Sequence, residues 1–379
     1  MPRTRRSILV LLLLLAPAAC AQQSPPPDKW RPVCATKVRC GDRELKSYDI
    51  SGMAYVGQAG GVTTFLVVHD SKATVTADKC AALVRVAAAP RRTYDKLDWI
   101  VDQSLKDKRP NLTSAMLGLA ANPFDLEELA AVPDRPNTFM ALSSKGWVYL
   151  VRLDEPKSQV VVLDMDILPD EHRDEHPEAR QSGLPPYQRE GLALQRLGTR
   201  TYIVWAQRGG DRSDGPCKAK SPPAALYWGV LEPLDPANPR IKITGVRQES
   251  IDLPWAGTDI KALGAGYCIE NFRPVAALKV GADGSVYAAS TVDRDEQVTE
   301  FTEDGRPFRS TVYKAGMFTQ KKDDKDGEEF TFVRSAAFTS FMPPFPKHKI
   351  EALELMPGTA DKFAFGTDDE ELGSWLYLQ

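Results

Sequence analysis

The sequence predicts an all-β protein built as a single β-propeller. Short runs of β-branched and aromatic residues recur between Gly, Pro and Asp-Gly turns, and no segment carries a long apolar stripe with a 3.6-residue period. A short Glu-containing pattern also recurs along the chain at the start of predicted strands. The 379 residues are 42% hydrophobic and 26% charged, which is typical of a globular protein and excludes a disordered or multi-span membrane chain.

The recurring pattern is a Glu, one further residue and a Leu. It begins at Glu127, Glu190 and Glu351, and an aromatic residue opens a second predicted strand twelve positions after each Glu. These aromatic residues are Phe139, Tyr202 and Phe363. Two weaker copies carry Ser51 or Val275 where the others have Glu, and Phe65 and Tyr287 follow them. The repeats therefore predict five pairs of strands in similar positions.

Two more strands are predicted after several of these pairs. They are Trp147–Leu153 with Gln159–Asp164, Ala225–Leu231 with Arg240–Gly245, and Val298–Phe301 with Arg309–Tyr313. Four strands in a repeated unit form a propeller blade, and stacked blades bury faces that one blade leaves exposed.

The last copy has room for only three strands before the chain ends, so a run near Trp30–Val38 is predicted to supply the fourth and close the ring. Five four-stranded blades are the main prediction. Six remain an alternative, because Ile251–Phe272 and Met317–Lys347 are unassigned.

The N-terminus has the pattern of a secretory signal peptide. Three Arg precede an apolar run from Ile8 to Ala16, which is shorter than the roughly 20 residues of a membrane span. Residues 1–21 are the expected signal, residues 22–29 a Pro-rich spacer, and residues 30–379 the propeller domain. Cleavage before Gln22 and cleavage before a lipidated Cys20 both fit the sequence. We expect an exported protein, periplasmic, secreted or lipid-anchored at the cell envelope, with no transmembrane span after processing.

Disulfide bonds are compatible with export, and five Cys follow Cys20. Cys217 and Cys268 are candidates for a bridge, although sequence alone does not fix the pairing. No pair has the C-x-x-C spacing of a zinc or redox site. The formal net charge of −3 and the lack of a basic run beyond the N-terminus exclude nucleic acid as the expected partner.

The innermost strands of a propeller all begin at one mouth of the central channel. Glu127, Glu190 and Glu351 are therefore expected to converge there, and oxygen-only ligands suit Ca²⁺ or Mg²⁺. The alternative is that each Glu caps its own blade by hydrogen bonds to backbone amides or to Arg189. Further residues are expected at the rim of the mouth as ligand-binding candidates: Ser51, His69, Asp70, Asp368 and Asp369. No G-x-S-x-G motif supports a nucleophile at Ser51, so no catalytic residue is assigned.

With these copies in view, the chain resembles the exported bacterial propellers of the phytase-like and esterase-like superfamily, which includes the SdiA-regulated propellers. The matching segments are Asp49–Tyr55 with Phe65–Asp70, Asp125–Ala131, Arg189–Leu194, and Ile350–Leu355 with Gly366–Glu370. The resemblance implies that acidic residues of the innermost strands hold calcium, with Glu127, Glu190 and Glu351 as the ligands.

The expected function is binding of a divalent cation and a small or peptidic ligand at the channel mouth. A metal-dependent phosphoesterase of phytase type is one alternative, in which calcium positions phosphate and activates water. A scaffold that binds an envelope protein is another. Propellers host all three functions, so the sequence does not decide whether the protein is an enzyme.

Overall fold

The computed structural model describes residues 30–32, 50–69, 80–87, 92–123, 125–169, 189–209, 224–251, 253, 272–292, 309–323, 327–340, 345–346, 348–358, 362–368 and 374–378. The predicted signal peptide, the spacer and the lipidation site Cys20 lie outside these residues. Cys217 and Cys268 also lie outside them, so the predicted bridge stays a prediction. The described Cys80 is buried, at 2% exposed.

The described strands form antiparallel units of four, numbered here in chain order. Unit 1 contains β2 (Gly52–Ala59), β3 (Val62–Val68), β4 (Ala81–Ala87) and β5 (Arg92–Val101). Unit 2 contains β6 (Leu126–Ala131), β7 (Thr138–Ser143), β8 (Trp147–Asp154) and β9 (Gln159–Ile167). Unit 3 contains β10 (Arg189–Leu197), β11 (Arg200–Gln207), β12 (Ala225–Leu231) and β13 (Ile243–Ser250).

Units 4 and 5 follow the same strand order. Unit 4 contains β14 (Phe272–Val280), β15 (Ser285–Val292), β16 (Arg309–Asp323) and β17 (Gly327–Ser340), and the short β18 (Phe345–Pro346) pairs with β16. Unit 5 contains β19 (Ile350–Leu355), β20 (Phe363–Thr367), β21 (Trp375–Leu378) and, at its outer edge, β1 (Trp30–Pro32).

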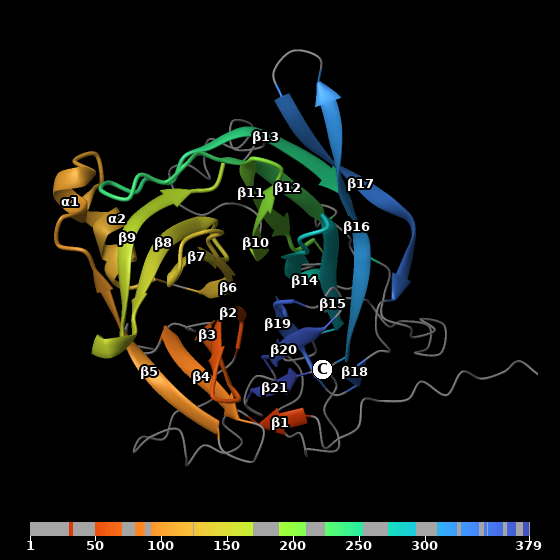
Figure 1. The fold of residues 1–379 in the computed structure, drawn as a ribbon, viewed down its shortest axis with the longest axis horizontal. Coiled ribbons are helices and arrows are strands. Elements are labelled where there is room, and N and C mark those ends of the chain that lie inside the picture. The colour runs from red at the N-terminus through yellow and green to blue at the C-terminus, as the bar shows by residue number, and fades with distance from the viewer. Residues whose placement is uncertain are drawn as a thin grey trace, which may run out of the picture.

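The units stand around a central axis (Figure 1). Their first strands contact one another in the cyclic order β2, β6, β10, β14, β19 and back to β2. The ring is closed by pairing of the N-terminal β1 with the C-terminal β21, as predicted from the missing outer strand. The prediction of an all-β propeller is therefore confirmed. The blade number of the whole chain stays a prediction, because segments between the described strands lie outside the structure.

Two features extend the ring outward. The helices α1 (Leu105–Lys108) and α2 (Ser114–Ala121) lie between units 1 and 2 in the chain, and the side chain of Thr113 caps α2. Figure 1 shows them outside β9. The outermost strands β5 and β9 pair in parallel, which joins units 1 and 2 into one sheet.

Most predicted strands are close to the observed ones, with differences in units 3 and 4. In unit 3 the predicted strand Arg240–Gly245 is observed as β13, Ile243–Ser250, three residues later in the chain at its start. Phe139, Tyr202 and Phe363 lie at the starts of second strands as predicted. Arg309–Tyr313 was expected to be a fourth strand, but it begins the third strand, β16, and pairs with β15. Val298–Phe301 lies outside the described residues. Sequence patterns do not reveal how many strands the segment before β16 contains. The position of Arg309–Tyr313 in the strand order was therefore predicted incorrectly.

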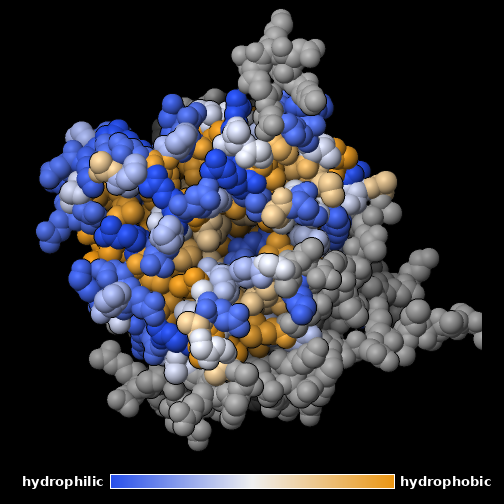
Figure 2. Space-filling model, viewed as in Figure 1, coloured by the Kyte–Doolittle hydropathy of each residue, from blue (hydrophilic) through white to orange (hydrophobic). Residues whose placement is uncertain are grey.

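Apolar side chains fill the spaces between neighbouring units. Trp205 and Tyr227 of unit 3 stack with ring centroids 5.6 Å apart and belong to one core with Met140 and Leu150 of unit 2. Unit 4 meets unit 5 in the same way, and burial of these facing side chains supplies the main driving force for closing the ring. Viewed down the axis, one face is hollowed near its centre, with hydrophobic residues around the hollow (Figure 2).

The innermost strands approach so closely that two Gly are required at their contacts. A Cβ added at Gly52 would lie 2.4 Å from the Cα of Glu128, and one added at Gly191 would lie 2.5 Å from the Cβ of Leu278. Gly191 also has a φ of +78°, which other residues rarely adopt.

Each innermost strand has a neighbour on one side only, so its other edge leaves backbone groups that need partners near the axis. Glu128, Lys279 and Glu354, here called the axial cluster, supply them. Glu128 Oε1 accepts from the N–H groups of Met53 and Leu129 at 3.3 and 3.0 Å. Lys279 Nζ donates to the carbonyl oxygens of the same two residues at 3.4 and 3.0 Å.

Glu354 completes the axial cluster from β19. Its Oε2 accepts from the N–H of Tyr55 at 3.2 Å and lies 3.2 Å from Lys279 Nζ, and its Oε1 accepts from the N–H of Leu355 at 3.0 Å. The cluster thus connects β2, β6, β14 and β19 across the axis.

No helix among the described residues is long and apolar enough to cross a membrane.

The contact at Gly191 predicts a large loss of stability on substitution. Gly191→Ala should lower the free energy of unfolding by about 2–4 kcal/mol, because both the left-handed backbone and the packing against Leu278 oppose a Cβ. Gly60→Ala is the control, since Gly60 has a φ of +56° but nothing within 4 Å of its added Cβ. Its cost should be about 1 kcal/mol. Equal losses in chemical denaturation of the two variants would contradict the packing argument.

The axial cluster predicts a pH dependence of stability. Burial raises the pKa of Glu128 to about 8, against the opposing effect of Lys279. Between the usual carboxyl pKa and about 8 the folded protein holds a proton that the unfolded chain has released, so the free energy of unfolding falls as pH rises through this range. Glu128→Gln should reduce that slope by up to about 1.4 kcal/mol per pH unit. Denaturation from about pH 5 to about pH 9 measures it, and the exposed Glu249→Gln should leave the slope unchanged.

Candidate functional site

The starts of the innermost strands lie at one end of the ring, which we call the mouth. Contacts of Gly52 with Glu128 and of Gly191 with Leu278 show that neighbouring first strands run side by side. β3, β9, β11, β13 and β15 end at the mouth, and the segments that follow them lie largely outside the described residues: 70–79, 170–188, 210–223, 254–271 and 293–308. Several turns at the other end are short, as at Gly60 and Gly61, although residues 232–242 form a longer connection between β12 and β13 there.

Irregular backbone at the mouth positions the repeated Glu residues. The pairing register shifts between Leu126 and Glu128, between Glu190 and Leu192, and between Ile350 and Ala352. A bulge of this kind bends a strand and redirects the side chains beside it, and bulges occur often next to functional sites. The recurring sequence pattern therefore marks a recurring bulge as well as a strand start.

Glu351 lies at the centre of a buried group of charges. Its Oε1 accepts from Arg273 Nη1 at 2.6 Å and lies 3.3 Å from Lys349 Nζ. The Lys349 Nζ is also 3.0 Å from Asp368 Oδ2. Lys349, Glu351 and Asp368 are each at most 2% exposed. The hairpin register places them together, because Lys349 precedes β19 and the N–H of Asp368, just after β20, donates to the Lys349 carbonyl.

Burial raises the pKa of Glu351 well above its ordinary value, and this is the largest effect on that carboxyl. Lys349 and Arg273 lower the pKa, whereas Asp368 and Glu190 raise it. The effect of Glu190 places this second predicted Glu within electrostatic reach of Glu351. The structure thus brings two of the three predicted residues together at the mouth.

Glu190 pairs with an arginine at the end of the neighbouring strand. Its Oε1 accepts from Arg208 Nη1 at 3.0 Å. Its Oε2 is buried and has no hydrogen-bond partner among the described residues. The Oε1 of Gln207, next to Arg208, accepts from the Tyr227 hydroxyl at 3.2 Å, while its buried Nε2 has no partner in the described part of the chain. Buried polar atoms of native proteins are usually paired, so these two atoms are candidate contacts for a ligand.

Glu127 is 7% exposed at the start of β6, the first strand next to β10. In the part of the chain that the structure describes, no group of three or more His, Cys, Asp or Glu side chains is arranged to hold a metal ion. The calcium site at Glu127, Glu190 and Glu351 stays a prediction.

The rim candidates have different surroundings. Ser51 is buried, and its N–H donates to the Val68 carbonyl at 3.2 Å. His69 is 4% exposed, and its Nε2 lies 2.5 Å from the Tyr94 hydroxyl oxygen. Asp368 joins the Glu351 group as described. Asp70 and Asp369 lie outside the described residues, so their roles are untested.

Sequence reasoning did not identify Arg208, Arg273, Lys349 or Gln207 as site residues. Three of them are bases that balance the acidic residues, and each lies at a strand end next to a repeated position. Arg273 lies two residues before Val275, in the copy that lacks its acid. A search for bases at the same strand ends as the repeated Glu residues would have found them.

No family model matches the chain, and no curated protein matches it. Several solved structures are similar in overall arrangement. A GH43 β-1,3-galactosidase is 8% identical, with 89% of this chain and 91% of that chain covered, at a TM-score of 0.41. A levansucrase variant from B. megaterium is 10% identical, with 93% and 85% covered, at 0.42. A luciferin-regenerating enzyme is 10% identical, with 88% and 92% covered, at 0.34. These values are too low to carry an argument about activity, and the strand order itself identifies the propeller.

The Glu190–Arg208 pair predicts a strong effect of removing the arginine. Arg208→Met should lower the free energy of unfolding by about 3–5 kcal/mol, because it leaves a buried carboxylate without its ionic partner. A second substitution, Glu190→Gln, should restore much of that loss. Chemical denaturation of the single and double variants measures the coupling. Arg196→Met is the control, since Arg196 and its partner Asp134 are 49% and 68% exposed, and it should cost less than about 1 kcal/mol.

Proposed function

We propose that this propeller is an exported protein that binds a small polar or peptidic ligand at the mouth. The observation that carries the proposal is the buried Glu190 Oε2, which has no hydrogen-bond partner among the described residues although Glu190 Oε1 accepts from Arg208. A ligand N–H or O–H group would satisfy it. The amide of Gln207 needs an acceptor, so a ligand with both donors and acceptors fits both positions.

The charge balance favours a ligand without a large net charge. Three acids at the mouth pair with three bases: Glu190, Glu351 and Asp368 with Arg208, Arg273 and Lys349. Glu127 and Arg189, at the starts of β6 and β10, add one charge of each sign. A phosphate-rich substrate is favoured by an excess of basic groups, and a calcium site by an excess of carboxylates. This balance therefore supports a neutral or zwitterionic ligand, such as a polyol or a short peptide, ahead of a phosphoester.

Calcium binding is the second candidate function. Its support is that Glu190 and Glu351 lie within electrostatic reach of each other and that Glu127 starts the neighbouring first strand. A bound Ca²⁺ would have to compete with Arg208 and Arg273 for the same carboxylates. We expect any such site to be weak unless residues outside the described part of the chain contribute further oxygen atoms.

Calorimetric titration of the protein with maltose, triglycine and calcium chloride tests the proposal. We expect maltose or triglycine to bind and Glu190→Gln to weaken that binding at least about tenfold, because the amide cannot accept two hydrogen bonds at that position as the carboxylate does. The exposed Glu249→Gln is the matched control and should bind as the wild type does.

Other outcomes would replace the proposal. Saturable calcium binding with a calcium-dependent rise in melting temperature, both lost in the Glu127→Gln/Glu190→Gln/Glu351→Gln variant, would establish the cation site instead. Absence of binding by all three probes would contradict ligand binding at the mouth and favour the envelope scaffold.

A further inference from the structure

A cavity lies at the opposite end of the ring from the mouth. Its volume is about 470 Å³, which falls in the range of small-molecule sites. It is lined by the last residues of β6, β10, β14 and β19 and by the turns that follow β14 and β19. None of the paired acids and bases at the mouth lines this cavity. A ligand here would therefore bind independently of one at the mouth.

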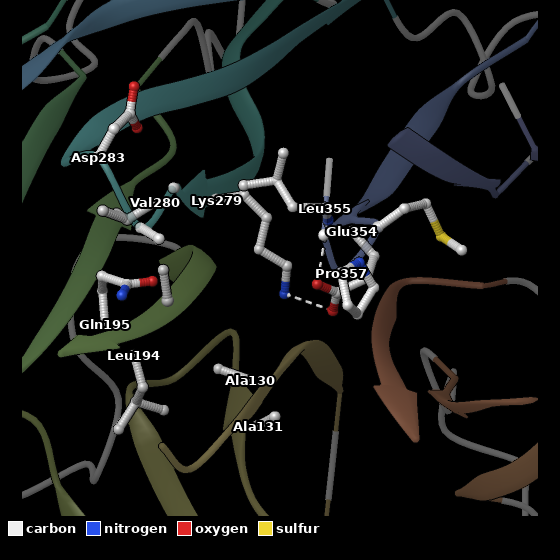
Figure 3. Close-up of a pocket in the computed structure, with 15 residues that line it drawn as sticks. Ala130, Ala131, Leu194, Gln195, Lys279, Val280, Asp283, Glu354, Leu355 and Pro357 are labelled. Carbon is white, nitrogen blue, oxygen red and sulfur yellow. Dashed lines mark hydrogen bonds and ion pairs between the residues drawn. The ribbon is translucent and has the colours of Figure 1, made fainter. Parts of the chain in front are cut away.

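The walls of this cavity are mainly apolar. Figure 3 shows Lys279 extending into the space between apolar wall residues and pointing toward Glu354. The apolar lining consists of Ala130, Ala131, Ala193, Leu194, Val280, Ala282, Leu355, Met356 and Pro357. Gln195 and Asp283 are polar residues of the wall, and both side chains already form hydrogen bonds, to the Arg196 carbonyl and from Ser285. The charged floor is the exposed part of the axial cluster, where the side chains of Lys279 and Glu354 are 7% and 12% exposed.

The ammonium group of Lys279 has no donor left for a ligand. It has three N–H groups, and three acceptors surround it: the carbonyl oxygens of Met53 and Leu129 and the carboxylate of Glu354. An anionic ligand would have to displace one of these partners. Since two of them are backbone carbonyls at an otherwise unpaired strand edge, displacement would leave a buried carbonyl without a donor.

The acceptors of the floor are not fully used. Glu354 Oε1 accepts one hydrogen bond, from the Leu355 N–H, and a carboxylate oxygen has two lone pairs. Glu128 belongs to the same cluster but is fully buried and does not line the cavity. At the floor, Glu354 Oε1 therefore offers a charged acceptor, whereas the charged donor Lys279 is fully used.

We propose that this cavity binds a small amphiphile whose ammonium head contacts Glu354 and whose hydrocarbon body lies against the apolar walls. The head donates to Glu354 Oε1, which leaves the existing bonds of Lys279 in place. The hydrocarbon body covers the side chains of Leu194, Val280 and Leu355. The same geometry disfavours a carboxylate of equal length, because the three N–H groups of Lys279 already have acceptors.

Three six-carbon probes separate the contribution of the head group from that of the tail. Hexylammonium, hexanol and hexanoate are titrated into the full chain by calorimetry. We expect hexylammonium to bind at least about tenfold more tightly than hexanoate, a difference of about 1.4 kcal/mol, with hexanol between them. Hexanoate binding as tightly as hexylammonium would overturn the proposal, and so would the absence of hexylammonium binding.

Variants locate the binding in this cavity. Ala131→Trp should abolish hexylammonium binding, because Ala131 lines the cavity and its exposed position tolerates a larger side chain. Ala59→Trp is the matched control, since Ala59 is likewise exposed at the end of an innermost strand but does not line the cavity. Equal affinity of both variants would place the probe elsewhere and contradict the proposal.

Glu354→Gln tests the head-group contact directly. It should weaken hexylammonium at least about fivefold and leave hexanol unchanged, because only the ammonium depends on the negative charge. If the variant fails to fold, Glu354→Asp keeps the charge but shortens the side chain, and it should weaken hexylammonium more than hexanol because the head group loses its contact. A parallel loss for both probes would show that these variants act on structure alone.

Discussion

The structure depends on how the inner edges of the first strands are satisfied near the axis. A strand at the centre of a propeller has a neighbour on only one side, and unpaired backbone groups there would be costly once the ring has closed. Glu128 and Glu354 each accept two backbone N–H groups, and Lys279 donates to two carbonyls. Three ionisable side chains thus connect four of the first strands. The cost is a carboxyl group at Glu128 that burial keeps protonated through neutral pH.

The axial cluster divides the centre of the ring into two different ends. At the mouth, bulged strand starts carry paired acids and bases, and the arrangement supports recognition of a polar ligand. At the other end the cavity walls are mainly apolar, with Lys279 and Glu354 at the floor. The axial cluster lies between the polar mouth and the apolar cavity and separates them. The two ends of the ring therefore suit different ligands.

Much of the fold followed from local sequence. Aromatic residues twelve positions after the repeated Glu mark second strands, because a short turn fixes the distance between the two strands of a hairpin. Closure by the N-terminus followed from the missing outer strand beside Trp375–Leu378. Unit 4 was predicted less well, since Arg309–Tyr313 belongs to a third strand and the hairpin of β16 and β17 extends far beyond it. Where the connection between two strands is long, sequence patterns alone do not predict the order of the strands in a unit.

By itself the sequence determined the strand pattern, the repeat and the positions of the acidic residues at strand starts, because these depend on residue type and local spacing. Only the tertiary structure decided what those acids meet. Arg208 and Arg273 reach Glu190 and Glu351 from other strands, the latter across 78 positions of the chain. Lys279 reaches Leu129 across 150 positions. In sequence, a carboxylate that pairs with an arginine looks the same as one that could bind a cation. The arginine partners become visible only when ring closure brings strands that are distant in the chain to one axis.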